Sequence, residues 1–184
     1  MEGYSFPRWW KFKVGYTWIM SGIAEFLAKD HERLDALLTQ ACADETRIDG
    51  DAYEAFRRGL LKHVGMEELI LLPAARRLGG AAVTLAQRAR LDHAALTSLL
   101  IPTPTAKLMS VLRAVLEPHD RMEEEEGGLY AQCVRALGTE EESVLARLRA
   151  ASDIPPAAHV DGPHVAASIR KALAAAGYKG PDAF

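Results

Sequence analysis

The feature that most constrains the fold of this chain is an internal repeat of histidine-bearing segments. Residues 30–38 (DHERLDALL) align with residues 92–100 (DHAALTSLL), and each begins with an Asp-His pair. Residues 63–68 (HVGMEE) align in the same way with residues 119–124 (HDRMEE). Each half of the chain therefore predicts a helix with one histidine, followed by a helix with a His-x-x-x-Glu motif. Two such helix pairs are expected to pack about a pseudo-twofold axis on which the four histidines converge.

Apolar residues recur every three or four positions from residue 21 to residue 151, and strand signals are nearly absent. Long helices are predicted over residues 21–42, 51–78, 82–101 and 105–137. A capping box at residues 139–142 predicts a short fifth helix to about residue 151, and a last short helix is expected over 164–176. The pattern predicts an all-α fold, an antiparallel up-down four-helix bundle with short C-terminal helices.

Capping and breaking residues refine these helix boundaries. Asp51 is the expected N-cap of the second helix, and Pro73 is expected to bend or end its last turns. Pro118 predicts a kink inside the fourth helix. Gly138 should end that helix, and Gly177 should cap the last one.

The composition divides the chain into three predicted parts. Residues 1–19 hold seven of the thirteen aromatic residues and are expected to be either an aromatic arm packed on the domain or an upstream extension before a start at Met20. Residues 20–151 are the predicted helical bundle with its short fifth helix. Residues 152–184 are a Pro-rich linker followed by the C-terminal helix. The apolar stretch 14–28 is too short for a membrane span and contains a glutamate.

Composition and charge exclude several classes of function. Hydrophobic residues make up 49% of the chain and charged residues 26%, which is enough for a real core. A net charge of −3 argues against a nucleic-acid or membrane-surface partner. Cys42 and Cys133 cannot form a disulfide framework or a Cys-rich zinc site; they fit a reducing compartment, and a cytoplasmic location is expected. Dinucleotide-binding, P-loop and nucleophile-elbow motifs are absent from the sequence.

Each histidine and glutamate of the repeat interrupts a stripe of apolar residues. His31 lies between Leu27 and Leu34. His63 and Glu67 continue an apolar stripe that runs to Ile70, and His119 and Glu123 continue one that runs to Tyr130. Taken singly, such residues are more often a satisfied core histidine or a surface ion pair. Together, they would cost several kcal/mol to bury without a partner, and a shared cation removes that cost. The predicted metal ligands are His31, His63, Glu67, His93, His119 and Glu123.

Two metal ions fit this ligand set better than one, because six such ligands on four helices resemble the carboxylate-bridged dinuclear sites of helix bundles. Imidazole and carboxylate without thiolate suit iron and permit manganese or zinc. With these motifs, the sequence over about residues 22–137 resembles the hemerythrin-like family, also called the HHE cation-binding domain. The resemblance implies two iron ions joined by an oxo or hydroxo bridge, with Glu67 and Glu123 bridging the metals.

Two departures from the oxygen-carrying members of that family affect the expected function. Carriers have a fifth histidine at the position of Thr97, and they place the fourth-helix acid at the position of Glu124. The internal repeat favours Glu123 over Glu124, because Glu67 has the same offset from its histidine. With two histidines, two bridging glutamates and the shared oxygen bridge, each iron is expected to be five-coordinate with one open position. Two open positions suit reaction with peroxide, nitric oxide or dioxygen better than simple carriage.

Three classes of function remain open from the sequence. The leading one is a non-haem di-iron protein that binds or senses dioxygen, nitric oxide or peroxide, or that handles iron. The alternative is an enzyme of oxidative or nitrosative stress defence that consumes peroxide or nitric oxide or repairs iron–sulfur clusters. The repair proteins with a similar ligand set carry a Cys-containing N-terminal region without a counterpart in this sequence. The third class is a structural bundle in which the metal only stabilises the fold.

Residues outside the ligand set receive simpler expectations. Cys42 and Cys133 are predicted to be small core residues, with a redox role as the lesser alternative. Asp35 is expected to be solvated, and Glu126 is the one other residue of its acidic run that can point inward. Asp30 and Asp92 precede ligand histidines and are expected to orient neighbouring groups, and His159 and His164 are expected at the surface.

Overall fold

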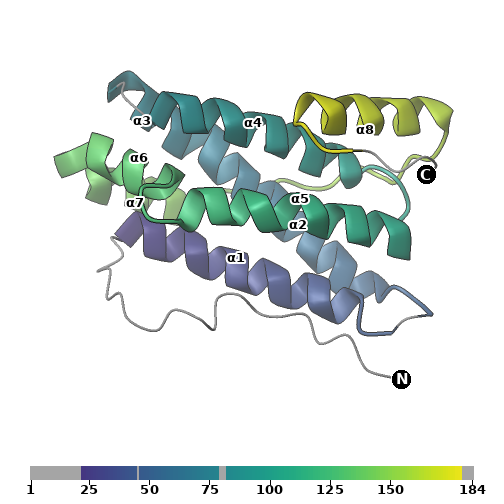
Figure 1. The fold of residues 1–184 in the computed structure, drawn as a ribbon. Helices are drawn as coiled ribbons and strands as arrows, with labels where there is room; N and C mark the ends of the chain where they lie inside the picture. Colours follow the sequence, from purple (N-terminus) through teal and green to yellow (C-terminus); the bar gives the residue numbers. More distant parts are fainter. Residues whose placement is uncertain (1–21, 45, 79–81, 180–184) are drawn as a thin grey trace.

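The computed structural model describes residues 22–44, 46–78 and 82–179, so the predicted arm over residues 1–19 lies outside the described residues. Within these ranges the regular structure is all helical, apart from one isolated β-bridge between Asp44 and Arg47 (Figure 1). The α-helices are α1 (Gly22–Ala41), α2 (Gly50–Met66), α3 (Leu72–Leu78), α4 (Ala82–Leu99), α5 (Ala106–Glu124), α6 (Leu129–Leu137), α7 (Glu141–Arg149) and α8 (Pro163–Ala175). Among the described helices, none has the length and apolar character that a membrane span requires.

The long helices pair as the sequence repeat predicts. Helix α1 packs along α2, and α4 packs along α5. Helices α3, α6 and α7 gather at one end of the molecule, where α6 contacts α1, α3, α4 and α5, whereas α8 packs on α4 toward the other end (Figure 1). This arrangement is compatible with the predicted four-helix bundle. It brings the four histidine-bearing helices side by side.

Side-chain caps fix the starts of two of these helices. The carboxylate of Asp49 accepts hydrogen bonds from the backbone N–H groups of Asp51 and Ala52, so the N-cap of α2 is Asp49, two residues before the predicted cap at Asp51. Thr105 caps α5 by accepting from the N–H of Leu108. The predicted capping box at residues 139–142 is wrong, because the chain forms a short 3-10 turn, η3 (Gly138–Glu140), before α7.

The second predicted helix is interrupted by a π-helical segment, η2 (Glu67–Leu71). Its wider turn, closed by a hydrogen bond from the Leu72 N–H to the Glu67 carbonyl, changes the phase of the helix. Leu71 and Leu72 are therefore fully buried, whereas the predicted stripe residue Ile70 is only half-buried. The interruption begins six residues earlier than the proline at position 73 and starts at one of the predicted ligands.

The fourth predicted helix is broken rather than kinked. Pro118 lies within α5, and the helix continues past it to Glu124. The break falls at residues 125–128, where Gly127 has a φ of +79° and Gly128 lies against the carbonyl groups of Met122 and Glu123. A Cβ atom at Gly128 would lie 2.5 Å from the Met122 carbonyl oxygen, so the close approach requires glycine. The glycine pair thus ends α5 directly after the second predicted acid ligand.

The C-terminal segment belongs to the same packed structure. Apolar residues of α8 join the core formed by α1, α2, α4 and α5. The linker before α8 is held by Arg57, whose guanidinium donates to the backbone carbonyls of Leu100 and Ala157. His159, in this linker, contacts Glu54 at 3.0 Å and stacks on Tyr53.

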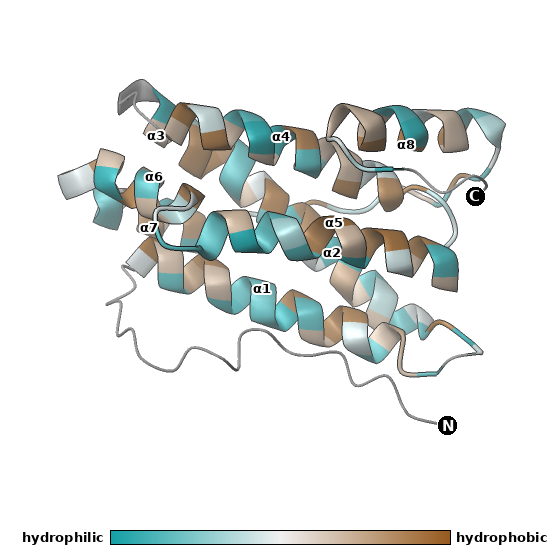
Figure 2. Cartoon of the chain, in the orientation of Figure 1, coloured by the Kyte–Doolittle hydropathy of each residue, from teal (hydrophilic) through white to brown (hydrophobic). Residues whose placement is uncertain are grey.

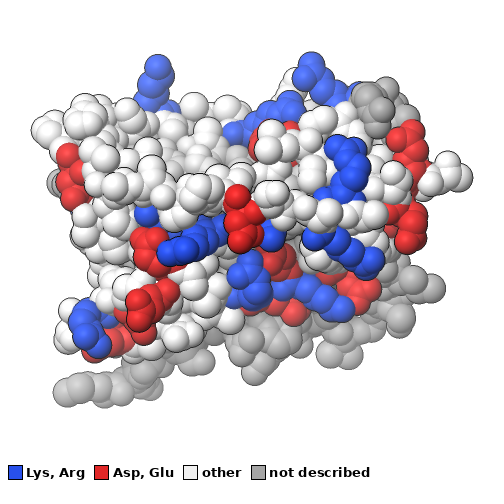
Figure 3. Space-filling model, turned by 180° about the vertical axis from the view of Figure 1, so that it is seen from behind, with Lys and Arg blue, Asp and Glu red and all other residues white. Residues whose placement is uncertain are grey.

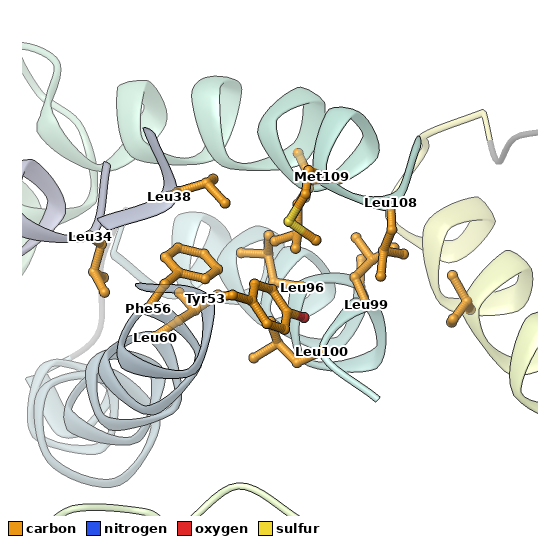
Figure 4. Packing of buried hydrophobic residues seen from close by; sticks show 14 of the residues in the cluster. Leu34, Leu38, Tyr53, Phe56, Leu60, Leu96, Leu99, Leu100, Leu108 and Met109 are labelled. Atoms are coloured by element: carbon orange, nitrogen blue, oxygen red, sulfur yellow. The ribbon is translucent and has the colours of Figure 1, made fainter. Parts of the chain in front are cut away.

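Each helix carries both hydrophobic and hydrophilic residues along its length (Figure 2). The buried apolar residues form two clusters. One cluster, partly drawn in Figure 4, contains Leu34, Leu60 and Leu96. The other contains Leu27 and Met66. The predicted ligands lie between the members of these clusters in sequence, so a polar layer separates the two cores. On the face in Figure 3, acidic and basic side chains are interspersed.

Candidate metal centre

All six predicted ligands lie in the polar layer between the two apolar cores. Their exposed fractions range from 0% for Glu67 and Glu123 to 7% for His31. They come from α1, α2, η2, α4 and α5, so each histidine-bearing helix of the repeat contributes to the cluster. The structure therefore brings together the residues His31, His63, Glu67, His93, His119 and Glu123.

The four histidines form two pairs, one from each half of the repeat. The Nε2 atoms of His31 and His63 lie 2.8 Å apart. The rings of His93 and His119 meet edge to face, with centroids 4.9 Å apart. Because α1 packs on α2 and α4 packs on α5, each helix hairpin supplies one pair of imidazoles.

The two glutamates lie between these pairs. Glu67 directs Oε1 toward His63 Nε2 at 3.5 Å and Oε2 toward His93 Nε2 at 2.9 Å. Glu123 directs Oε2 toward His31 Nε2 at 3.5 Å and Oε1 toward His119 Nε2 at 3.5 Å. Each carboxylate therefore presents one oxygen to each histidine pair.

Several polar atoms of the cluster are buried without a hydrogen-bond partner. They include Glu67 Oε2, His93 Nε2 and Glu123 Oε1. An unsatisfied buried polar group costs about 1–3 kcal/mol, and more when it is charged. Ligand atoms within 4.8 Å of one another form two overlapping sets, Glu67 with His93, His119 and Glu123, and His31 with His63 and Glu123. A metal ion would satisfy these atoms, so the donor set fits a cation.

The electrostatics of the cluster point the same way. Burial disfavours the charged imidazolium of His31, but the carboxylates of Asp120 and Glu124 outweigh burial and raise the pKa of His31 to about 8. In the same way, carboxylates raise the pKa values of His63 and His93 to about 10 against the effect of burial. Protonated imidazoles therefore balance the buried acids when no cation is bound. A metal ion competes with these protons for the same nitrogen atoms.

The two central acids respond differently to their surroundings. Burial opposes the ionisation of Glu67, yet His63 and His93 hold the pKa of its carboxyl well below the usual range. Burial and the neighbouring Glu67 raise the pKa of Glu123. One of the two carboxylates thus carries its charge more readily than the other when the imidazoles are their only counter-ions.

A second layer of carboxylates orients the histidines. Each ring nitrogen Nδ1, on the side away from the cluster centre, faces an acid. Three of these contacts are hydrogen bonds, with Nδ1 to oxygen distances of 2.8 Å for His31–Glu124, 2.7 Å for His93–Glu68 and 3.0 Å for His63–Asp30. The fourth, His119–Asp92, is longer at 3.7 Å and is not a hydrogen bond. The four contacts obey the sequence repeat. A histidine that donates from Nδ1 keeps the Nε2 lone pair for a metal, as ligand histidines usually do.

Arginines hold three of these outer acids. Three ion pairs form in this way, at 2.7 Å for Arg33–Asp30, 3.0 Å for Arg90–Glu68 and 2.8 Å for Arg88–Asp92. Although burial opposes its ionisation, His63 and Arg33 lower the pKa of Asp30 to about 2. Each arginine therefore places a cation beside an acid that faces an imidazole Nδ1.

The outer layer also bears on Glu124, the alternative to Glu123 as a ligand. Glu124 Oε1 faces Nδ1 of His31, on the outer side of the ring, whereas Glu123 occupies the centre of the cluster. The orienting role expected of Asp30 and Asp92 agrees with their contacts, but Glu68 and Glu124 were not anticipated in that role. The available signal was the repeated Glu-Glu pair at residues 67–68 and 123–124.

The sequence also gave no indication that Tyr130 reaches the centre of the cluster. Its hydroxyl lies 2.7 Å from Glu67 Oε1 and 2.9 Å from Glu123 Oε2. It also lies 3.1 Å from His31 Nε2 and 3.4 Å from His63 Nε2. Burial and the carboxylates of Glu123 and Glu67 raise the pKa of the Tyr130 hydroxyl well above its ordinary value. Sequence periodicity places Tyr130 correctly on the buried stripe, but periodicity does not show where a hydroxyl points.

The other residues considered from the sequence lie outside the cluster centre. Thr97 is half-buried and donates to the carbonyl of His93 at 2.7 Å, and Asp35 is exposed as expected. Glu126 is exposed in the break after α5, so it does not take the inward orientation that the sequence allows. Burial, with the nearby carboxylates, raises the pKa of the Cys133 thiol to about 12, which disfavours a reactive thiolate. Cys133 is buried, as expected of a small core residue.

The remaining cysteine and the two other histidines are not members of the cluster. Cys42 is half-buried and packs against the core that contains Leu34. His159 keeps a partly exposed position, in agreement with the expected surface placement, and it contacts Glu54. His164 is exposed, as expected.

Comparisons with known proteins add no relative to this description. No protein-family model, no curated protein and no solved structure matches the chain.

Proposed function

We propose that this protein is a non-haem di-iron protein of the hemerythrin-like type, built on a four-helix bundle, that binds or senses dioxygen, nitric oxide or peroxide. One observation carries the proposal: two pairs of buried histidines flank two buried glutamates, and each glutamate presents one oxygen to each pair. This is the arrangement expected of two ions that share bridging carboxylates.

The geometry favours two ions over one. The oxygens of Glu67 are divided between His63 and His93, and those of Glu123 between His31 and His119. A single ion at one histidine pair would leave the other pair, and the carboxylate oxygens that face it, without a metal. Two ions, one at each histidine pair, satisfy all the central oxygens and the orphaned Nε2 of His93.

The donor chemistry favours iron. Imidazole nitrogen and carboxylate oxygen suit iron, and among the described residues neither set of ligand atoms contains a cysteine sulfur. A bound iron pair supplies redox-active ions that take small ligands. The chain itself binds those ions through the six central side chains, orients the imidazoles through the outer acids, and excludes bulk water by placing the cluster between two apolar cores.

The test is the metal content and optical spectrum of protein purified from iron-rich medium. We expect close to two iron ions per chain and near-ultraviolet absorption from the oxidised form. The variant His63→Ala/His119→Ala should lose the iron, whereas the exposed control His164→Ala should retain it. Iron-free wild-type protein would contradict the proposal.

The same preparation distinguishes binding from catalysis. Addition of excess peroxide or nitric oxide should give one stoichiometric spectral change if the protein binds or senses its ligand. Continued consumption over many equivalents per chain would instead assign it to the enzymes of oxidative or nitrosative stress defence.

A further inference from the structure

We propose that Tyr130 is a further metal ligand, bound only to the ion at the His31/His63 pair, and that the two metal positions are therefore chemically different. This inference rests on the proposed di-iron function. It leaves an exchangeable position for an exogenous ligand only at the ion of the His93/His119 pair.

The first argument is the position of the hydroxyl oxygen. It lies 2.7–3.4 Å from four ligand atoms, one each from His31, His63, Glu67 and Glu123. Bonds from nitrogen and oxygen ligands to such an ion are about 2.0–2.2 Å, so two neighbouring ligands at right angles lie roughly 3 Å apart. The Tyr130 oxygen therefore has the spacing of a neighbouring ligand on the same ion.

The second argument is hydrogen-bond capacity. A phenol has one proton, so it donates to either Glu67 or Glu123 at any moment, although both carboxylates lie within 2.9 Å. A cation at the centre satisfies all of these oxygens together. On binding, the O–H bond of Tyr130 breaks, an O–metal bond forms, and the proton leaves to solvent water, with no change in oxidation state.

The third argument is that the repeat lacks this residue in its other half. The position eleven residues after His119 is Tyr130, and the position eleven residues after His63 is Ala74, whose buried methyl group offers no donor atom. The His93/His119 pair therefore has no tyrosine at the corresponding place in the sequence. The four histidines and two bridging glutamates give the two ions equal numbers of protein ligands. Tyr130 adds one ligand to the ion at the His31/His63 pair only.

The direct test is the visible and resonance Raman spectrum of the iron-loaded, oxidised protein. A phenolate bound to ferric iron gives a visible charge-transfer band, and excitation within that band enhances tyrosine ring vibrations. We expect both signals in wild-type protein and their loss in Tyr130→Phe. Tyr53→Phe is the matched control. Tyr53 lies in α2 and is buried like Tyr130, but its hydroxyl has no hydrogen-bond partner among the ligand atoms. The control should keep both signals.

A titration with azide gives a second readout that does not depend on the phenolate band. Wild-type protein should bind one azide per two irons, and Tyr130→Phe should bind two. Wild-type protein that holds two irons but shows no phenolate band, or that binds two azides, would overturn the inference while leaving the proposed function intact. A phenolate band that survives in Tyr130→Phe would also overturn it. Protein that holds no iron would contradict the proposed function itself.

Discussion

The two histidine pairs share a scaffold but differ in the groups that surround them. In both halves the Nδ1 atom of the first histidine faces the second acid of the opposite Glu-Glu pair, as in His31–Glu124 and His93–Glu68. The His31/His63 pair, however, has the Tyr130 hydroxyl within 3.4 Å. The corresponding residue in the other half is Ala74. A repeat thus builds the site, and single departures from the repeat decide how its two positions differ.

A second departure lies beside the first. Asp120 directly follows His119 and places Oδ1 3.9 Å from His31 Nε2, whereas the corresponding residue after His63 is Val64. Asp120 Oδ1 is buried without a hydrogen-bond partner. Both additional oxygen atoms, from Tyr130 and Asp120, therefore face the same histidine. The comparison predicts that the His31/His63 position is richer in oxygen donors than the His93/His119 position.

The largest expected effect comes from a change that breaks both halves at once. Glu123→Ala should lose iron from both positions, because each oxygen of Glu123 faces a different histidine pair. Loss of a bound ion removes about 2.7 kcal/mol of stability per site when the free ion is at 100 times its dissociation constant. Iron per chain and the melting temperature with and without iron measure the effect. Glu125→Ala, an exposed neighbour, is the control, and a variant that keeps both irons would contradict the bridging geometry.

The next effect separates the halves. His63→Ala and His119→Ala should each lose at least one iron and lower the melting temperature of the iron-loaded protein. Because Tyr130 contacts His31 and His63, the phenolate band should disappear in His63→Ala and persist in the iron that His119→Ala retains. Metal analysis with visible spectroscopy checks this.

His159→Ala is an internal control for that pair. It should retain both irons but lose some stability, because His159 contacts Glu54 and Tyr53. If His159→Ala lost the metal while His63→Ala kept it, the argument from the repeat would be wrong.

The third effect concerns pH and the metal-free protein. The pKa of His31 is raised to about 8 and those of His63 and His93 to about 10, compared with 6.5 for an ordinary histidine. Groups with raised pKa values stabilise the folded state fully below pH 6.5, and this stabilisation is lost as the pH rises through 8 to 10. His31 alone contributes about 2 kcal/mol.

Thermal unfolding across this pH range tests the effect. The melting temperature of the metal-free protein should fall from pH 6.5 to pH 10. The increase in melting temperature on iron binding should grow over the same range, because iron needs the neutral imidazole. A metal-free protein that becomes more stable above pH 6.5 would contradict the predicted charge balance.

The smallest effect tests whether the outer layers of the two halves are equivalent. Glu68→Gln and Glu124→Gln should each weaken iron binding about 10–100-fold, since acids that orient ligand histidines usually contribute that much. The Nδ1 contacts of 2.7 Å and 2.8 Å predict similar losses in the two variants. Competition with a chelator measures the affinity, with Glu125→Gln as the control. An unchanged affinity in either variant would show that the two outer layers are not equivalent.

Much of the fold was readable from the sequence because helix periodicity and glycine signals are local. The first helix begins and ends within a residue of the prediction, and Gly177 has the left-handed φ of +79° expected after α8. The helix breaks were less accurate. The π-helical turn after Glu67 depends on packing that no local pattern encodes, and Gly127-Gly128 outweighs Pro118 as the break after α5.

The central six residues were predictable because the repeat supplies them twice, and the structure places them together, although their role as metal ligands is still a prediction. Tyr130 was not predictable as part of the cluster because a tyrosine on an apolar stripe has an apolar ring and a polar tip. The position of Tyr130 in the apolar periodicity indicates that it is buried. Only the three-dimensional placement of α6 brings its hydroxyl to Glu67 and Glu123.

The most direct measurement of the central claim is anomalous X-ray diffraction at the iron edge from crystals of the iron-loaded protein. We predict two peaks, one bonded to His31, His63 and Tyr130 and the other bonded to His93 and His119, with Glu67 and Glu123 bonded to both. No peak between the two apolar cores, or a single peak that leaves one histidine pair free, would contradict the account.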